Sequence, residues 1–488
     1  MRDSKLIEIL ETLSEAEWKL LNRFLDFSLS AVSYDVTSLD IKALFLYLMP
    51  FRANLADFNA EPDDVYTKLY PDKPFKKGRI EKIMSALLQE TEKFIIYQRY
   101  TNDSFYADYA LMQHFFERKQ FDRFERMVDK FRVYFQKTKA KDAINYLQEV
   151  HVEWLECDFQ ALFNTRKGDL NVRNTLNSLD LLYIVARLDF LATLLSQNRS
   201  TRLEVEENIR LLHEMDSIIF KKGYSDMPLI ATYRLALDIL MDKGNIDLLT
   251  QKLTEHEAVL TFSQQKKLNA IIRNFYTSKY NSGEDVFIFK IAELLKKHLE
   301  KGYLYYENGL QHTTLINIVS VGLKVKDNDW VLSVLKEHRH KIISQDDSEE
   351  IYIFNTAQYY FAMGNFNAAN DCLSSGYKFK NIYYELAKRR LEIKILYETG
   401  ETDLCAFRNE AFKNHIFNWS KKKNALPQTS FEPNNSFIDL VEKLLTTLKG
   451  DNKRLEKLEE KIIKSRNFAD RDWLLDKLSQ LKKVGFKK

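Results

Sequence analysis

The sequence predicts an all-α protein in which a small helical N-terminal domain precedes an α-solenoid of antiparallel helix pairs. The chain has only 13 Gly and 7 Pro among 488 residues, whereas sheet-rich folds need these residues at many turns. Residues 79–167 contain neither. Apolar side chains recur at the spacing of helices with one buried face. Similar breaks between helices recur in the second half of the chain, which indicates stacked helix pairs.

The length and charge of the chain limit what it can be. A chain of 488 residues is too long for a single compact core, so several domains or an elongated array are expected. Apolar residues make up 45% of the chain, which is enough to build a core. The 73 Lys and Arg nearly balance the 70 Asp and Glu. This balance is typical of a solvated surface and argues against binding of polyanions by the chain as a whole.

Three features predict a cytoplasmic protein without a membrane segment. Cys157, Cys372 and Cys405 are odd in number and far apart, which is typical of free thiols in a reducing compartment. Residues 1–13 lack the apolar block of a signal peptide. The most apolar long stretch, residues 179–195, contains three charged side chains. It is therefore expected to be a buried helix and not a membrane span.

Residues 1–100 are expected to form the small N-terminal domain. Ser14 and Glu17 have the spacing of a capping box at the start of one helix. Ser38 is expected to cap the next helix. Pro62 can occupy the first turn of a short third helix, where its missing N–H costs nothing.

The most regular amphipathic helix of the chain spans residues 80–95 and organises this domain. Its apolar face follows i, i+3, i+4 spacing. That face consists of Ile80, Ile83, Met84, Leu87, Leu88, Thr91, Phe94 and Ile95. The opposite face is charged, so one side of the helix must lie against the core. We therefore predict that Ile83, Leu87 and Phe94 are buried.

The segment 364–366 (Gly-Asn-Phe), followed by Ala369, resembles the turn of a tetratricopeptide (TPR) repeat. The glycine can end the first helix in a left-handed cap. The aromatic ring can then pack between the two helices, and the alanine lets them approach closely. Comparable segments begin at Asn328 and at Gly400, each 36 residues away. That spacing is close to the TPR period of about 34 residues.

Weaker copies of this turn begin at three earlier positions: Lys119, Gly244 and Gly283. The repeat array is expected to span residues 105–488, with residues 421–435 as a loop and a terminal capping helix near residues 470–483. The sequence departs from the TPR pattern because it has no Pro between residues 229 and 426, whereas TPR repeats usually close with one. This argues against a standard TPR peptide groove.

Four short segments carry a further resemblance. They are residues 69–75 (LYPDKPF), residues 83–88 (IMSALL), residues 94–95 (FI) and residues 473–474 (WL). In these segments the chain resembles a family of uncharacterised bacterial helical-repeat proteins, most closely over the N-terminal hundred residues. The resemblance implies a layout of a small helical N-terminal domain followed by helical repeats, and it implies no chemistry.

Patterns for catalysis or metal binding are absent or incomplete in the sequence. Glu337 and His340 form one ExxH and are expected on the same face of a helix. A di-iron bundle needs two such motifs, and the HExxH of zinc proteases is missing. His151 and Cys157 lie six residues apart, so on a helix they point in different directions. Phosphate-binding glycine loops and the GxSxG motif are also missing. We therefore expect a protein that is not an enzyme and uses no cofactor or metal.

A cluster of basic side chains suggests a second role. It surrounds the start of the helix at residues 80–95 and consists of Lys73, Lys76, Lys77 and Arg79. Helix N-termini attract phosphates. With residues 97–105 as a wing, this region could be a helix-turn-helix or winged-helix domain that binds DNA. The alternative is a solvated turn beside a core helix, and the acidic residues on the same helix favour it.

Residues 451–488 carry a second basic excess, with twelve Lys and Arg against seven acidic residues. Such a tail can contact nucleic acid or an acidic partner, or be a soluble helical end. Together these observations predict a non-enzymatic scaffold or adaptor that binds a protein partner, not yet identified, through a helical-repeat surface. The alternative is a DNA-binding regulator with a helix-turn-helix N-terminal domain and a repeat body for sensing or oligomerisation.

Overall fold

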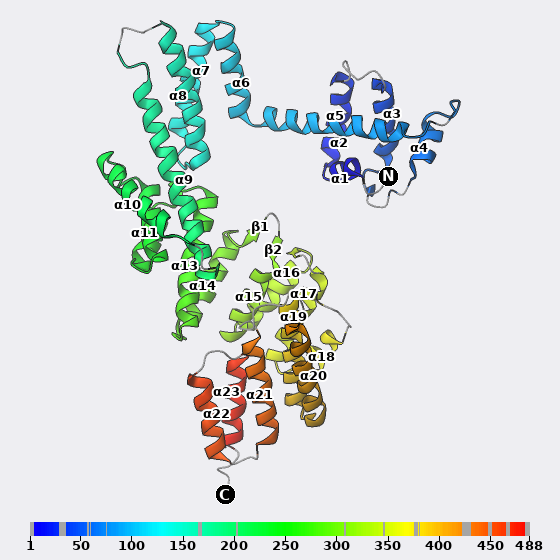
Figure 1. Ribbon diagram of the computed structural model, residues 1–488, viewed down its shortest axis with the longest axis vertical. Helices are drawn as coiled ribbons and strands as arrows, with labels where there is room; N and C mark the ends of the chain where they lie inside the picture. Colours follow the sequence, from blue (N-terminus) through cyan, green and yellow to red (C-terminus); the bar gives the residue numbers. More distant parts are fainter. Residues whose placement is uncertain are drawn as a thin grey trace. The chain divides into compact units, whose positions relative to one another are not determined.

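The structure is a computed structural model. It describes residues 4–28, 36–55, 58, 60–74, 76–163, 168–201, 204–306, 309–344, 347–374, 379, 381–421, 431–447, 451–464 and 469–483. Over this part of the chain the fold is all-α, as predicted, with helices α1 to α23 and three very short strands (Figure 1). Most helices pack against their neighbours in sequence, which is the packing of a solenoid.

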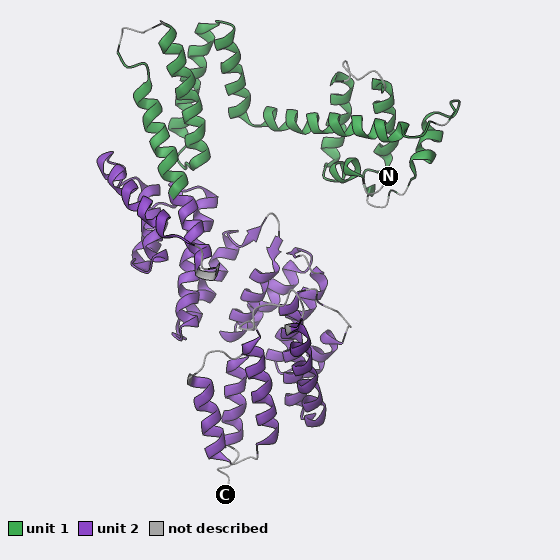
Figure 2. Cartoon of the chain, in the orientation of Figure 1, with its two compact units in different colours: residues 1–187 green, residues 188–488 purple. Residues whose placement is uncertain are grey.

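The chain forms two compact units, Met1–Arg187 and Leu188–Lys488 (Figure 2). Unit 1 contains α1 (Lys5–Glu11), α2 (Glu15–Ser28), α3 (Ser38–Leu48), the 3-10 turn η1 (Met49–Phe51), α4 (Pro62–Leu69), α5 (Arg79–Asn102), α6 (Ser104–Glu117), α7 (Phe121–Lys137) and α8 (Ala143–Phe163). The long helix α9 (Val172–Thr201) begins in unit 1 and ends in unit 2.

One hydrophobic core joins α1 to α5. Helices α1, α2, α3 and α4 all contact α5. The prediction for α5 is confirmed, since Ile83, Leu87 and Phe94 have 0%, 0% and 2% of their surface exposed. Trp18 of α2 stacks on Phe45 of α3 at a ring distance of 5.3 Å. The apolar face of α5 is therefore the surface on which the N-terminal helices assemble.

The helix caps in this region follow local hydrogen bonding. The backbone N–H of Ser14 donates to the Glu17 carboxylate (2.7 Å), and the predicted capping box is confirmed. The predicted cap at Ser38 is wrong. Thr37 caps α3, because its hydroxyl accepts from the Asp40 N–H while the Asp40 carboxylate accepts from the Thr37 N–H. Only Thr37 has an acidic residue three positions later, whereas Ser38 has an apolar one.

The wing predicted at residues 97–105 is wrong. Helix α5 continues without a break to Asn102, and α6 begins at Ser104 (Figure 1). Asp103 separates the two helices, and its carboxylate accepts from the Phe105 N–H at 3.1 Å. The reason is local, because this stretch has no Gly or Pro to end a helix early.

The second core of unit 1 is aromatic. Helices α6 and α7 contact each other, and both contact α8. Phe105, Phe124, Phe131 and Phe159 are buried in this core. The rings of Phe124 on α7 and Phe159 on α8 lie 4.6 Å apart. This packing accounts for part of the high phenylalanine content of the chain.

Unit 2 is also built mainly of helices. It contains α10 (Glu206–Lys221), α11 (Pro228–Leu240), α12 (Ile246–Glu255), the 3-10 turn η3 (Glu257–Val259), α13 (Phe262–Asn281), α14 (Phe287–Glu300), α15 (His312–Lys324), α16 (Asn328–His338), α17 (Ser348–Ala362), α18 (Phe366–Leu373), α19 (Ile382–Thr399), α20 (Thr402–Ser420), α21 (Glu432–Thr446), α22 (Asn452–Lys464) and α23 (Arg471–Lys483). Contacting pairs include α11 with α12, α13 with α14, α15 with α16, α17 with α18 and α19 with α20.

Many of these helices end in the same way. The left-handed residue is the first past the C-cap, or the C-cap itself at Gly400, and the next N–H bonds back to a carbonyl five residues earlier, which is the Schellman motif. The motif occurs in both units. Its left-handed residues are Lys119, Gly223, Asp242, Gly283, Gly302, Lys326, Gly364 and Gly400.

The repeat turns lie close to the predicted positions, with two differences in register. The left-handed residue of the α15–α16 turn is Lys326, not Asn328, so this turn precedes Gly364 by 38 residues instead of 36. In the α11–α12 turn the left-handed residue is Asp242, not Gly244. Gly244 is needed for another reason, since a Cβ there would lie 2.7 Å from the Ile239 backbone N.

The turn between α17 and α18 has the predicted local structure. Gly364 has φ +73°, and the Asn365 side chain accepts from the Ala368 N–H at 3.2 Å. The ring of Phe366 packs on Phe361 of the preceding helix at 5.5 Å. Ala369 has no exposed surface. The two helices of this pair are therefore held by an aromatic contact and a small residue, as the sequence suggests.

A small sheet interrupts the helices of unit 2. It consists of β1 (Tyr305–Tyr306), β2 (Gly309–Gln311) and β3 (Ile342–Ile343), in the order β1-β2-β3. β1 and β2 are antiparallel, and β2 and β3 are parallel. Gly309 permits this pairing, because a Cβ there would lie 2.4 Å from the Lys341 carbonyl oxygen. The sheet was not predicted, since its strands are too short to show an alternating pattern.

The C-terminal helices α21, α22 and α23 share a core with α19 and α20. Residues 422–430 of the predicted 421–435 loop lie outside the described residues. The predicted end of the loop is wrong, because α21 begins at Glu432 with Pro433 in its first turn, where proline is tolerated. The terminal helix is α23, and its Leu474 and Leu478 are fully buried. None of the helices described is both long enough and apolar enough to span a membrane.

Candidate functional site

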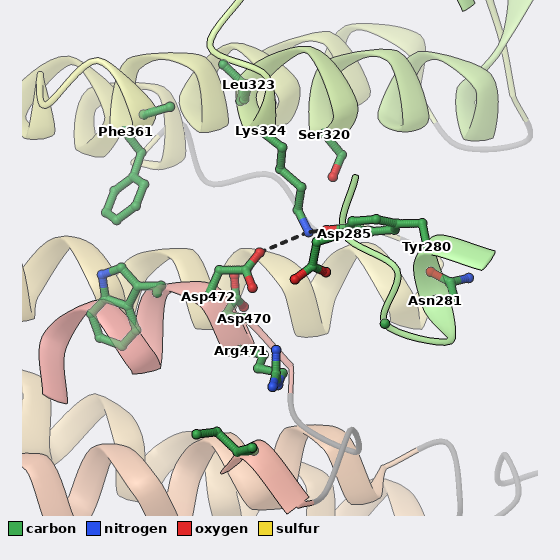
Figure 3. Close-up of a pocket in the computed structure, with 14 residues that line it drawn as sticks. Tyr280, Asn281, Asp285, Ser320, Leu323, Lys324, Phe361, Asp470, Arg471 and Asp472 are labelled. Atoms are coloured by element: carbon green, nitrogen blue, oxygen red, sulfur yellow. Dashed lines mark hydrogen bonds and ion pairs between the residues drawn. The ribbon is translucent and has the colours of Figure 1, made fainter. Parts of the chain in front are cut away.

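A hollow of about 790 Å³ lies in unit 2, where the C-terminal helices meet the repeat helices (Figure 3). Its walls come from the C-terminal end of α13, from α15 and α17, and from α22 and α23. Phe361 contributes an aromatic surface, and Tyr280, Lys324 and Asp472 contribute polar groups. The hollow is therefore mixed in character, as surfaces that bind peptides usually are.

Lys324 spans this hollow. Its ammonium donates to the Tyr280 hydroxyl at 2.7 Å and pairs with the Asp472 carboxylate at 3.0 Å. Figure 3 shows the side chain reaching from α15 toward Asp472. Burial lowers the pKa of Lys324, but the hydrogen bond to Tyr280 and the charge of Asp472 outweigh it, so the net pKa is raised. Lys324 is therefore charged at neutral pH and already has an acidic partner.

Asp470 anchors the turn that leads into α23. Its carboxylate pairs with Arg390 at 2.7 Å and with Lys394 at 2.6 Å, both on α19. Burial raises the pKa of Asp470, yet the two cations outweigh burial and hold its pKa well below the usual range. The backbone of Asp470 is left-handed, with φ +52°. The ion pairs thus fix a backbone conformation that non-glycine residues seldom adopt.

The same face of α19 also holds the first half of α23. Glu398 follows Arg390 and Lys394 at four-residue spacing, so the three side chains share one face of the helix. Glu398 accepts from the Trp473 indole N–H at 2.6 Å and pairs with Lys477 at 2.7 Å. The Lys477 side chain is 7% exposed. This wall of the hollow is therefore tied to the repeat helices by buried charged hydrogen bonds.

A second hollow, of about 300 Å³, adjoins the first between α13, α14 and α15. The two share Tyr280, Asn281, Ser320 and Lys324. The second hollow, called the inner hollow below, also contains Arg273, whose pKa is lowered by burial. Together the two hollows form a continuous candidate binding surface within unit 2.

Two of the four basic side chains predicted to cluster at the start of α5 contact other protein groups. Lys76 and Lys77 are exposed. The Lys73 ammonium lies 5.0 Å above the Tyr70 ring. Arg79 donates to the Asp40 carboxylate at 2.7 Å, and that carboxylate also accepts from the Tyr70 hydroxyl. The structure therefore brings the cluster to one turn, with Arg79 engaged in holding α5 to α3.

Asp40 is the centre of that contact. Burial raises its pKa, but hydrogen bonds from Tyr70 and Thr37 and the charge of Arg79 outweigh burial, so its net pKa is lowered. The pKa of Tyr70 is raised, first by burial and then by its bond to Asp40. Arg79 therefore links α5 to α3 through Asp40, beside the core of the N-terminal helices.

The remaining residues considered for chemistry do not converge. Helix α16 ends at His338, so Glu337 and His340 do not share a helix face, and that expectation is wrong. His338 is buried and bonds to the Tyr305 hydroxyl at 2.9 Å. Cys157 is an unpaired thiol whose pKa is raised by burial. Among the described residues no His, Cys, Asp and Glu side chains group as metal ligands.

Arg273 and Lys324 were not identified from the sequence. A signal was present, because polar side chains recur at helical spacing on both helices that carry them. On α13 this stripe contains Arg273, Thr277 and Asn281, and on α15 it contains Thr314, Asn317, Ser320 and Lys324. Only the packing of α13 beside α15 shows that the two stripes face one hollow.

Comparisons with known proteins add no relative. No protein-family model matches the chain, and neither a curated protein nor a solved structure matches it. The fold therefore defines the class, an all-α protein with solenoid-like packing of adjacent helices, and the function has to be argued from the hollow itself.

Proposed function

We propose that the protein is a non-enzymatic scaffold or adaptor whose unit 2 binds a segment of a protein partner. The observation that carries this proposal is the pair of adjoining hollows. They lie on rigid helical walls, and they combine the apolar surface of Phe361 with polar groups such as Ser320 and Lys324. Stacked helix pairs typically present extended surfaces for peptides. A wall fixed by buried ion pairs loses little conformational entropy when a partner binds.

The finer parts of the proposal rest on the sequence. The TPR-like turns and the short N-terminal segments support membership of the uncharacterised bacterial helical-repeat family. Within the described part of the chain Cys157, Cys372 and Cys405 form no disulfide, which is consistent with a reducing compartment, and we place the protein in the cytoplasm.

The test is a quantitative capture experiment with full-length protein in a lysate of the source cells. Ser320 is exposed and lines both hollows, so Ser320→Trp should fill the binding surface. Ser333 on α16 is also exposed and lies outside both hollows, and Ser333→Trp is the matched control. We expect a defined protein to be enriched by the wild type and the control and to be lost with Ser320→Trp. Equal capture by all three proteins, or none by any, would contradict the proposal.

The DNA-binding alternative is tested separately. The engagement of Arg79 by Asp40 supports the choice of a protein partner over nucleic acid. Duplex binding at low salt should therefore be weak and unaffected by the double variant Lys76→Glu, Lys77→Glu. Salt-sensitive binding that disappears in this variant would favour the DNA-binding regulator instead.

A further inference from the structure

The inner hollow between α13, α14 and α15 has an unusual charge distribution. Its described lining includes two cations, Arg273 and Lys324, and no Asp or Glu. The hydroxyls of Thr277 and Ser320 and the amide of Asn274 line it as well. The hollow therefore offers the hydrogen-bond donors of Ser320 and Asn274 and the positive charge of Arg273, whereas Lys324 already pairs with Asp472 outside this lining.

Arg273 carries the uncompensated charge. Lys324 is paired with Asp472, but no ion pair joins Arg273 to an acidic residue anywhere in the described part of the chain. Its described side-chain contact is with a histidine, since Nη1 lies 3.4 Å from Nδ1 of His298. Arg273 is partly buried, and a guanidinium has five N–H donors. A sheltered charge of this kind is costly unless an anion meets it.

His298 positions Arg273 without supplying charge. Its side chain has no exposed surface, and Nε2 lies 3.1 Å from the Asn269 side-chain oxygen. Burial, and then the charges of Arg273, Lys297 and Lys301, lower its pKa to about 4. The imidazole is therefore neutral at pH 7, with Nε2–H donating to Asn269 and Nδ1 accepting from Arg273. The guanidinium is held by a neutral acceptor, and its other N–H groups remain available to a ligand.

We infer that the inner hollow is a binding site for an oxyanion, and specifically for a carboxylate of an acidic peptide segment. The choice of a peptide rests on the proposed function, in which unit 2 binds a protein partner. Arginine binds carboxylates through two parallel N–H···O bonds, which gives both charge and geometry. The side-chain amide of Asn274, next to Arg273, can donate to the same group. The Thr277 hydroxyl instead donates to the Arg273 carbonyl oxygen at 2.9 Å. The larger hollow adjoins this site and offers the apolar surface of Phe361 to the rest of the peptide.

The experiment measures fluorescence anisotropy with full-length protein and labelled hexapeptides. One peptide carries two adjacent glutamates, and the other carries two glutamines in their place. The glutamate peptide should bind the wild type about tenfold more tightly than the glutamine peptide, which is the usual strength of a charge-assisted hydrogen bond. Arg273→Gln should remove that difference, and Arg273→Lys should keep part of it. The matched control is Arg210→Gln, an exposed position on α10, and it should behave like the wild type.

Each result separates the inference from its alternatives. The inference would be overturned if the wild type bound the two peptides with equal affinity. It would also be overturned if Arg273→Gln still preferred the glutamate peptide over the glutamine peptide as strongly as the wild type does. Binding of inorganic phosphate, measured by calorimetry and lost in Arg273→Gln, without binding of the glutamate peptide would overturn the assignment to a carboxylate. If the capture experiment yields a partner that is lost with Ser320→Trp but kept with Arg273→Gln, the carboxylate site is wrong while the scaffold proposal stands. The thermal unfolding of each variant establishes that it is folded.

Discussion

Replacing Gly322 by alanine tests how closely the repeat helices pack. Gly322 is buried within α15, at the point where α16 crosses it. A Cβ at this position would lie 2.4 Å from Cγ2 of Val331 and 3.2 Å from the ring of Trp330. Favourable carbon contacts lie at about 3.5–4.0 Å. Val331 is fully buried and its branched side chain has little freedom, so the helices would have to move apart.

Two effects of opposite sign set the magnitude. Alanine is better than glycine within a helix by about 1 kcal/mol. Overpacking of a close contact costs about 1–3 kcal/mol, and the Cβ contact here is far inside the usual range. Because α15 and α16 pack along their length, the overlap cannot be relieved by one rotamer change. We therefore take the overpacking cost from the upper part of this range, about 2–3 kcal/mol. After the gain of about 1 kcal/mol from helix propensity, Gly322→Ala should lower the free energy of unfolding by about 1–2 kcal/mol.

The assay is chemical denaturation followed by circular dichroism, with a double-mutant cycle. Val331→Ala removes the methyl group that the new Cβ would meet. As a single change it should lower stability, but in the double variant it should relieve the steric overlap caused by Gly322→Ala. The double variant should therefore be more stable than the sum of the two single changes predicts. Additive effects, or a net gain of stability from Gly322→Ala, would show that the helices do not approach as closely as described.

Three further predictions concern stability. His298 has a pKa of about 4 against an ordinary 6.5, so its contribution to stability is present above pH 6.5 and is lost as the pH falls toward 4. In denaturation experiments over this pH range, the wild type should lose up to about 3 kcal/mol more free energy of unfolding than His298→Gln. Parallel pH curves for the two proteins would contradict this. Asp470→Asn keeps a residue that tolerates a left-handed backbone but removes the charge that pairs with Arg390 and Lys394. It should lower the free energy of unfolding by about 2 kcal/mol and reduce hydrogen-exchange protection in α22 and α23. Unchanged protection would refute the anchoring role. Leu87→Ala in the core should lower the free energy of unfolding by about 2–5 kcal/mol, as measured by denaturation. Leu20→Ala, at an exposed position, should change it by less than about 0.5 kcal/mol. Similar losses for both variants would refute the assignment of Leu87 to the core.

The helices of this protein could be predicted because their causes are local. The buried face of α5, with Ile83, Leu87 and Phe94, follows from spacing alone, since helical period and burial are two aspects of one pattern. The Gly364 and Gly400 turns were also found, because glycine is the residue that most easily adopts left-handed φ.

The errors also have physical causes. Lys326 and Asp242 adopt left-handed φ without being glycine, so the register of those turns could not be taken from glycine positions. At such sites the packing of the following helix outweighs the intrinsic cost of the conformation. The predicted wing failed because no residue between α5 and α6 forces an early break. The sheet of β1, β2 and β3 depends on pairing between segments about 30 residues apart, as with Leu310 and Ile342.

The sequence by itself determined the all-α class, the apolar faces of the helices and most of the repeat turns, because each depends on residues within one or two helical turns. The tertiary structure decided the hollows. Arg273 lies 51 residues before Lys324, and Lys324 meets Asp472 a further 148 residues along the chain. Charges so far apart in sequence acquire or lack a partner only through the packing of whole helices. Lys324 has its counter-charge through α23, whereas Arg273 faces a hollow with none.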